Sequence, residues 1–499
     1  MLFGYKSETD RANRIVNEAA RQQITDKDFI VKEIDGFKRS QKRIWMQRGD
    51  KYYRGEHDIL QQKREMIGAS GELEEVKNLP NHKIVDNQYK KMVVQKSNYL
   101  LGQPISFKTD NTQYAKVLRK TFGKRFQKLI KNIGENSLNC GISWLHIYYN
   151  NDGELAFKRF PATQVVPQWK DAEHEVLDYL IRFYPTILWD GQQEKEVERV
   201  EVYKSEGIYK YILEGSSLQE EEEFFVPYFY VVEGEEKDAY NWSKIPVIPF
   251  KYNNSEIPLI KNVKTLQDAM NTIESSFQNN MCEDTRNTIL VLVNYDGTDL
   301  GDFRKNLSTY GAVKIRDADG SKGDVRTLHI EVNAENYRTI LEILKKAIIE
   351  NAMGYDAKDD RMGGSPNQMN IESMYNDIDL DANSMETEYQ ASFEELLWFI
   401  NMHLNNTGQG DFEDEEVEVI FNRDMLINEK EAIESCQSSV GVLSLETIVS
   451  QHPWVDDVVA ELERIKAEKQ EEIESYGYGG DPFRKQENLE VKNNGKAKE

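Results

Sequence analysis

The chain has 499 residues, of which 39% are hydrophobic, so it can form roughly two to four domains with sizeable cores. It contains no run of about 18 apolar residues, which excludes a membrane-spanning helix of ordinary length. The formal net charge of −24 predicts a soluble protein that repels nucleic acid at long range.

The N-terminal sequence has no apolar signal core, so we expect no export. Three cysteines lie far apart, at Cys140, Cys282 and Cys436. This spacing excludes a disulfide framework and a CxxC metal knuckle and suits a reducing compartment.

Helices are predicted first in chain order. Residues 10–48 read as one charged helix with a modest apolar face, and residues 84–101 as a second helix. Gly102 and Pro104 end the second helix in the usual order. The side chains on one face of that helix are Val85, Tyr89, Met92, Val93, Lys96 and Leu100.

Residues 142–232 change to β-type patterns. A hairpin is predicted over 142–160, turning at the "NNDG" of 150–153, and a second over 197–213. Three prolines within 245–260 predict an extended connector, because proline lacks a backbone donor and disfavours helix before it.

Two helices, 260–285 and 334–353, bracket a β-rich module over 286–333. The apolar face of the second helix is widened by Ile343 and Ile349, which predicts packing on more than one neighbour. The simplest geometry is an antiparallel helix pair with the module at its tip. Identical neighbours would cover such a stalk, and a repeated heterologous contact around an axis closes a ring.

The stretch "GYDAKDDRMGGSPNQMN" (354–370) interrupts the helical pattern with glycines, a proline and charges. Apolar positions from Ile371 to Leu404 then predict one long helix over about 370–404. An acidic loop, a strand and further helices follow, with Ser444 as a helix cap and Asn428 with Glu431 as a capping pair. Beyond about residue 470 the composition predicts disorder.

Catalytic motifs are absent: there is no GxxxxGK[ST], HExxH or GxSxG. The Asp/Gly elements at 150–153 and 317–324 resemble calcium loops but lack the complete pattern, which favours hairpin turns. The acidic cluster at 413–416 (Glu413, Asp414, Glu415 and Glu416) could hold magnesium, although a solvated loop is favoured.

Four segments together resemble phage portal proteins of the SPP1 type. They are "YYRGEHDIL" with "NHKIVDNQYKKMVVQKSNYLLGQPISF", then "IPVIPFKYNN", then "GYDAKDDRMGGSPNQMNIESMYNDIDLDANSMETEY", and last "LSLETIVSQHPWVDDVVAELERI". Their order and spacing match the family across nearly the whole chain, and the combination is more specific than any one of them.

The resemblance implies an elongated α+β fold assembled as a ring with a central channel. Its parts would be an N-terminal wing (1–258), stem helices (259–285 and 334–353) around a β-rich clip (286–333), a tunnel loop (354–369), a long wing helix (370–405), a helical crown (406–470) and a charged tail (471–499).

It also implies a role: a conduit at one capsid vertex, through which double-stranded DNA is packaged and later ejected. The expected partners are other copies, usually twelve in all, double-stranded DNA held weakly and without sequence preference, the terminase large subunit, the major capsid and scaffolding proteins, and a head-completion adaptor. We expect no cofactor, no metal, no membrane and no enzymatic activity, a place in the virion, and assembly in the bacterial cytoplasm.

Two sets of residues follow from this mapping. The channel-facing loop residues are Asp356, Lys358, Asp359, Asp360, Arg361, Gly363 and Gly364. The subunit-packing stem residues are Met270, Phe277, Tyr337, Leu341, Leu344 and Ile348. Glycines, including Gly354, would give the loop backbone angles closed to other residues, and the acidic wall would let DNA slide.

Two alternatives stay open. A metal-dependent nuclease or phosphodiesterase would use the acidic clusters and cleave in a magnesium-dependent way. A scaffold or adaptor without a channel would form oligomers that lack a central hole.

Overall fold

The structure is a computed structural model that describes residues 26–67, 71–77, 79–190, 193–233, 236–284, 289–293, 324–328, 334–356, 368–423, 429–455 and 458–476. The chain divides into two compact units: residues 1–356 with 377–424, and residues 357–376 with 425–499. Helices and antiparallel sheets both contribute, so the predicted α+β class is confirmed.

The described part of the predicted 10–48 helix, from residue 26 on, forms two helices rather than one. α2 (Asp26–Lys38) and α3 (Gln41–Tyr53) are separated at Ser40, whose hydroxyl accepts a 3.1 Å hydrogen bond from the Arg43 N–H and caps α3. The prediction of a single helix over 10–48 was therefore wrong in its described part. A serine at that position competes for the backbone and starts a new helix.

Three further helices form the centre of the first unit. They are α4 (Gln88–Leu101), α5 (Thr112–Thr121) and α6 (Lys124–Cys140). α4 starts four residues later than predicted from the 84–101 pattern, because Asn87 caps it by accepting from the Lys90 N–H. α4 packs on α6, and α6 in turn packs on the first strand after it.

Antiparallel sheets follow, and both predicted hairpins are confirmed. One sheet has the order β13-β4-β5, and the other is a meander ordered β10-β9-β8-β7-β6. The first comprises β4 (Ile142–Tyr149), β5 (Leu155–Phe160) and β13 (Val247–Lys251). The second comprises β6 (Val165–Trp169), β7 (Leu177–Asp190), β8 (Gln193–Lys204), β9 (Gly207–Glu214) and β10 (Ser217–Val226). The shorter elements are η1 (Asp58–Gln61), η2 (Ala162–Gln164), β1 (Glu65–Ile67), β2 (Leu73–Glu75), β11 (Phe229–Glu233) and β12 (Glu236–Tyr240).

The "NNDG" element is the turn of the β4–β5 hairpin. The Asn150 side chain accepts from the N–H groups of Asp152 and Glu154, at 3.0 and 2.8 Å, and Gly153 has a φ of 75°. This is an Asn-capped turn of the kind predicted. Most of the second Asp/Gly element, 317–323, lies outside the described residues.

The proline-rich connector forms part of a sheet. Its residues 247–251 are β13, a fully buried edge strand paired with β4. Pro249 is tolerated there because an edge strand leaves one side of its backbone without a partner strand. Its carbonyl instead accepts a hydrogen bond of 2.6 Å from Ser392 of the long helix.

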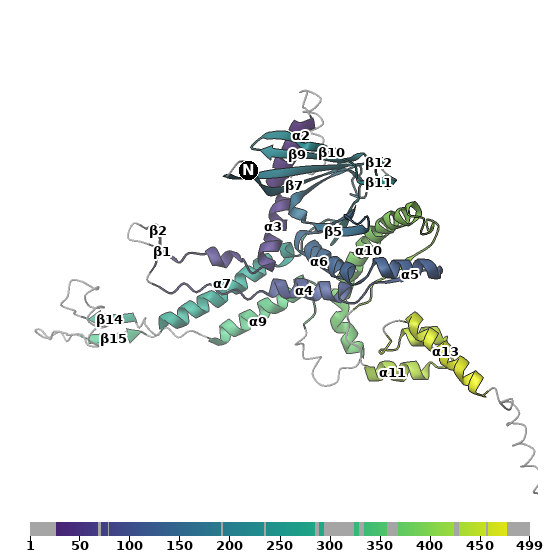
Figure 1. Ribbon diagram of the computed structural model, residues 1–499. Helices are drawn as coiled ribbons and strands as arrows, with labels where there is room; N and C mark the ends of the chain where they lie inside the picture. The colour runs from purple at the N-terminus through teal and green to yellow at the C-terminus, as the bar shows by residue number, and fades with distance from the viewer. Residues whose placement is uncertain are drawn as a thin grey trace, which may run out of the picture. The chain divides into compact units, whose positions relative to one another are not determined.

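Two long helices pack side by side, α7 (Ile260–Asp284) and α9 (Ala334–Asn351) (Figure 1). Between them in sequence, β14 (Ile289–Val293) and β15 (Asp324–Leu328) pair antiparallel. The helix–module–helix order matches the sequence prediction in its described parts.

The longest helix is α10 (Gln368–Asn406), and residues 377–406 belong to the first unit. Its Phe393 is fully buried and contacts several rings, including those of Phe126, Phe250 and Phe421, at centroid distances of 5.8–6.1 Å. β16 (Glu418–Ile420) pairs with β3 (Ser106–Lys108) beside this cluster. The predicted long helix at 370–404 is confirmed.

The second unit is helical in its described parts. It contains α11 (Glu429–Ser438), α12 (Leu445–Ser450) and α13 (Val458–Tyr476). Ser444 caps α12 as predicted, accepting from the Thr447 N–H at 3.2 Å. Asn428 lies outside the described residues. α13 continues through Tyr476, so disorder does not begin at residue 470 as expected.

Candidate functional site: the stem pair and its base

α7 and α9, which we call the stem pair, are joined by an aromatic contact. The rings of Phe277 and Tyr337 lie 4.8 Å apart, and Asn280 donates a 3.2 Å hydrogen bond to the Tyr337 hydroxyl. Met270 and Ile348 are completely buried within one chain. These two side chains therefore pack inside the protomer and are not available to a neighbouring subunit.

The stem pair has exposed apolar side chains on both helices. Leu341 and Leu344 are half-buried, but Ile340 and Ile343 on α9 are 44% and 60% exposed, and Met281 on α7 is 47% exposed. Single exposed apolar residues are ordinary, but these three leave apolar area on both helices that a partner can cover.

α7 also buries a polar stripe. Gln267, Asn271 and Ser275 are at most 4% exposed, and Asn279 continues the four-residue spacing. A segment that we call the strap, residues 82–89, runs along this stripe. Its N–H groups donate to the stripe over 2.7–3.2 Å: His82 to Asn279, Ile84 to Ser275, Asp86 to Asn271 and Tyr89 to Gln267.

The end of α3 is tied to the same stripe. The buried ring of His57 contacts the Asn271 amide at 2.7 Å and stacks on Tyr52 with centroids 4.4 Å apart. Burial lowers the pKa of His57, which favours the neutral ring. The Tyr52 hydroxyl donates to Asp268, and Lys264 bonds the same carboxylate at 2.6 Å. The base of α7 is thus fixed by polar contacts as well as by apolar burial.

The end of α9 is held by a buried lysine. Lys96 of α4, only 3% exposed, donates to the Met353 carbonyl at 3.0 Å and to Asp381 of α10 at 2.7 Å. Tyr252 donates to the same carboxylate at 2.8 Å. Burial lowers the pKa of Lys96, and the Asp381 charge opposes that shift. One ammonium group therefore links three segments distant in sequence.

The next residues are held by an amide clamp. Gln95 donates to the Tyr355 carbonyl at 2.9 Å and accepts from the Tyr355 N–H at 3.2 Å. Met353, not Gly354, has the left-handed backbone, with a φ of 50°. Gly354 is required for space, because an added Cβ would lie 2.7 Å from the Met92 sulfur. The expectation that Gly354 supplies an unusual backbone angle was wrong.

A second charged cluster fixes α10 near this point. Arg423 bonds Asp379 at 2.6 Å and Asn383 at 2.7 Å, and it also pairs with Glu386. Tyr99 of α4 donates to Asp379 at 3.0 Å. Burial and the adjacent carboxylate raise the pKa of Tyr99 to about 12. α4 is thereby bonded to α10 at two successive positions, Lys96 and Tyr99.

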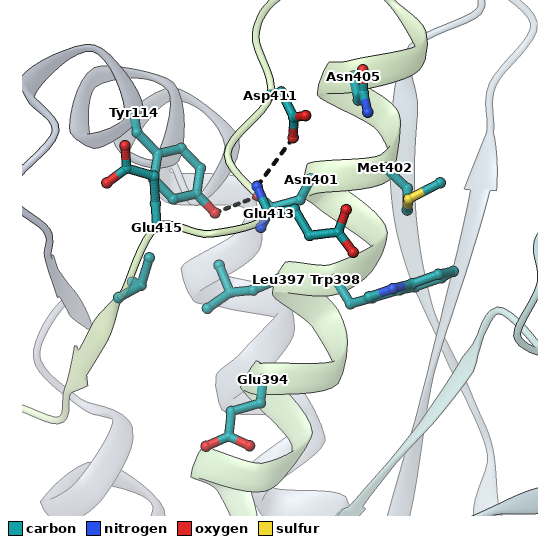
Figure 2. Close-up of a pocket in the computed structure, with 11 residues that line it drawn as sticks. Tyr114, Glu394, Leu397, Trp398, Asn401, Met402, Asn405, Asp411, Glu413 and Glu415 are labelled. Atoms are coloured by element: carbon teal, nitrogen blue, oxygen red, sulfur yellow. Dashed lines mark hydrogen bonds between the residues drawn. The ribbon is translucent and has the colours of Figure 1, made fainter.

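A pocket of about 270 Å³ lies between α5, α10 and the loop that contains Asp411, and Figure 2 shows the residues that line it. Tyr114 stacks on Phe412 with ring centroids 4.5 Å apart and donates a hydrogen bond to Asn401. The carboxylates that line the pocket are Glu394, Asp411, Glu413 and Glu415. Asn111 donates to one of them, Glu415, at 2.9 Å.

The metal-centre alternative has no support in the residues described. Over those ranges, no group of three or more His, Cys, Asp or Glu side chains is arranged to hold a metal ion. Nor does any helix within them have both the length and the hydropathy to cross a membrane.

The sequence-predicted loop residues fall mostly outside the described part. Asp356 is described directly after the Gln95 clamp, whereas Lys358, Asp359, Asp360, Arg361, Gly363 and Gly364 are not. Sequence reasoning placed Lys96 on the apolar face of its helix without giving it a role. A lone lysine on such a face is itself a signal of a buried acidic partner.

The chain is similar over most of its length to known phage proteins. Residues 34–475 match the family described as phage portal protein, SPP1 Gp6-like. The portal protein of Bacillus phage SPP1 is 28% identical over 479 residues, covering 95% of this chain and 92% of that protein. The portal protein of Clostridium phage phiCD119 is 26% identical over 419 residues, covering 82% and 88%.

A match of this extent defines the class: these are structural proteins of the phage particle, in a family that forms rings and associates with capsid and terminase. The chain belongs to the SPP1 Gp6-like family of phage portal proteins. Portal function in a bacteriophage, with the family's role in DNA packaging, follows from this membership.

Proposed function

We propose that twelve copies of this chain form a ring around an axial channel at one capsid vertex, with the stem pair facing its neighbours through Ile340, Ile343 and Met281. The supporting observation is that these three apolar side chains are exposed, whereas Met270 and Ile348 of the same helices are completely buried. A repeated contact between these exposed side chains and an adjacent subunit closes without exposing apolar surface.

Residues 354–369 are the tunnel loop in this proposal. The observation that carries it is the fixed entry to the segment: Lys96 holds the Met353 carbonyl and Gln95 holds both backbone groups of Tyr355. A loop that contacts moving DNA needs a rigid root, so that force on its tip reaches the stem. Lys358 and Arg361 would make brief phosphate contacts among Asp356, Asp359 and Asp360.

The contacts with DNA are weak and independent of sequence. Each firm phosphate contact adds affinity that translocation must overcome, and the chain carries a net charge of −24. The acidic surface keeps the duplex centred, and the loop resists slippage between packaging steps.

The other partners dock outside the channel. The terminase large subunit, which supplies the ATPase, binds the clip at 286–333 during packaging, and a head-completion adaptor replaces it afterwards. The wing and the crown at 406–470 contact the major capsid and scaffolding proteins. The chain has no enzymatic activity or cofactor of its own, is assembled in the bacterial cytoplasm and remains in the virion.

End-on negative-stain images of the purified protein test the ring. We expect annular particles with a central hole. Oligomers without a hole would favour the adaptor alternative, and a monomer or dimer with magnesium-dependent cleavage of DNA would favour the nuclease.

The loop is tested separately with Gly363→Pro and Gly364→Pro combined. We expect rings to form normally, while packaged DNA is retained poorly. Normal packaging and retention in this variant would contradict the loop's role and leave the ring intact.

A further inference from the structure

A cationic segment contrasts with the acidic chain. Between Asp110 and Glu135 there is no Asp or Glu, while residues 116–131 carry seven basic side chains. They are Lys116, Arg119 and Lys120 on α5, and Lys124, Arg125, Lys128 and Lys131 on α6. The two helices follow each other across the turn at Phe122 and Gly123 (Figure 1).

The opposite faces of both helices are buried, which directs the cations outward. Leu118 of α5 and Ile130 of α6 are completely buried. By contrast, six of the seven basic residues are exposed, and Lys131 is partly exposed. Apart from Arg119, none of the seven has an acidic partner within 4.0 Å in the ranges that the structure describes.

Helix stability does not account for these charges. Arg119 and Lys120 lie in the last turn of α5, where cations favour the helix dipole. Lys124 and Arg125 lie in the first turn of α6, where the dipole disfavours cations, and Gly123 supplies no side-chain cap. The positive charge at the start of α6 opposes local folding and so points to an external partner.

The chemistry of the segment favours phosphate over another protein surface. Protein interfaces are anchored by buried aromatic and aliphatic side chains. No large hydrophobic side chain over residues 102–140 is strongly exposed, and every exposed position within 116–131 is a lysine or an arginine. Lysine- and arginine-rich surfaces without apolar anchors are typical of contacts with a nucleic-acid backbone.

We infer that the cationic segment 116–131 is a second DNA contact, which binds the phosphate backbone of double-stranded DNA outside the channel and without sequence preference. The inference rests on the proposed portal function for the presence of that DNA. It assigns opposite electrostatic roles to two surfaces: an acidic one that lets DNA slide, and a local basic one that holds it.

Covalently closed circular DNA separates this contact from threading, because a closed circle cannot pass through a preformed ring. Full-length rings would be mixed with labelled circular duplex at salt concentrations from 50 to 200 mM, and the affinity measured by gel shift. We expect binding that weakens steeply with salt.

The test variant combines Lys120→Gln, Lys124→Gln and Lys128→Gln. Losing three phosphate contacts should flatten the slope of log affinity against log salt by about 2.7, so that wild-type affinity falls on the order of 40-fold more than the variant's over this range. A matched control, Lys27→Gln with Lys195→Gln and Lys210→Gln, removes the same charge from lysines already paired with Glu220, Glu214 and Glu223. The control should keep the wild-type slope.

Three results would overturn the inference. They are no binding of circular DNA by intact rings, equal slopes for the variant and wild type, or loss of ring assembly in the variant with unchanged DNA binding. The last would identify a contact with a second copy of the chain. Failure of the wild type to form rings would count against the proposed function instead, and the affinity of the unassembled chain for duplex would still test the segment.

Discussion

The C-terminal end and the middle of α9 differ in how they are packed. At its C-terminal end, Ile348 and Ile349 are buried, and the chain beyond is bonded by Lys96 and Gln95. By contrast, Ile343, only five residues before Ile348, is 60% exposed. The C-terminal end of the helix is therefore packed within the protomer, whereas its middle carries exposed apolar side chains.

The difference separates two kinds of stabilisation that a helical pattern cannot distinguish. Apolar residues at the base stabilise the fold of one chain, whereas the same residue type higher on α9 contributes only when a partner covers it. Substitutions in these two parts of α9 should thus affect different measurements. The expected loss in the free energy of unfolding is largest for the buried contacts at the base and smallest for the exposed side chains.

The largest effect is expected for Lys96→Met. Removing the ammonium group takes the cationic partner from the Asp381 carboxylate, whose side chain is 15% exposed, and leaves the Met353 carbonyl without this donor. Tyr252 still donates to Asp381. Removing one partner of a buried ion pair lowers the free energy of unfolding by about 3–5 kcal/mol. Urea unfolding measures the change. The control Lys346→Met, at a lysine 76% exposed, should stay within about 0.5 kcal/mol of wild type. A loss of stability below about 1 kcal/mol for Lys96→Met would contradict the anchoring role of Lys96.

A loss of about 2 kcal/mol is expected for Asn271→Ala. The change leaves the Asp86 N–H and the His57 ring nitrogen without their partner in a buried site. Hydrogen exchange at the strap amides should accelerate with the loss of stability. Gln278→Ala, an exposed position on the same helix, serves as the control. Unchanged protection of the Asp86 amide would show that the stripe does not hold the strap.

Glu395 should make the stability of the fold depend on pH. Burial raises the pKa of its carboxyl to about 7, against the opposing effect of the Lys244 charge. A carboxyl with a raised folded-state pKa stabilises the fold fully below its ordinary value, and this contribution is lost as pH rises through about 7. Glu395→Gln should therefore flatten the stability profile between pH 5 and pH 8 and stabilise the protein at pH 8 by about 1–2 kcal/mol, discounted for partial exposure. Glu394→Gln, an exposed neighbour, controls for the loss of a charge. Parallel profiles for wild type and Glu395→Gln would exclude the effect.

The smallest change in protomer stability is expected for Ile343→Ser, within about 0.5 kcal/mol, because the side chain is 60% exposed. The same substitution should reduce the fraction of rings in sedimentation velocity. Arg338→Ser, with a side chain 72% exposed on the same helix, should leave assembly unchanged. Wild-type assembly of Ile343→Ser would place the subunit contact elsewhere.

Much of the fold could be predicted because apolar periodicity reports burial. The stem pair and the long helix lie close to their predicted bounds, and both hairpins follow from turn residues such as Gly153. The break at Ser40 was missed, because a cap inside a charged helical pattern leaves the periodicity intact. The pairing of β13 with β4 was also missed, because prolines mark an extended strand without naming its partner.

The candidate site was less predictable for a related reason. Met270 and Phe277 of α7 were predicted as packing residues, but Gln267, Asn271 and Ser275 are buried as well, since the strap satisfies their hydrogen bonds. Polar residues at a four-residue spacing look like a solvated face until the segment that covers them is known. The anchoring role of Lys96 depends on Asp381, which lies 285 positions away in sequence, and no local pattern carries that information.

The strap has one mechanical consequence. From His82 to Asp86 the strap donors are two residues apart. Two residues of extended chain advance about 6.6 Å and four residues of helix about 6.0 Å, so the two repeats nearly match there. The step from Asp86 to Tyr89 takes three residues, because Tyr89 already lies in α4. The mismatch of about 0.6 Å per step accumulates, so only a few successive hydrogen bonds of this kind can form before donor and acceptor are too far apart. Because the last donor, Tyr89, lies in the first turn of α4, that helix sets the register of the extended strap along α7.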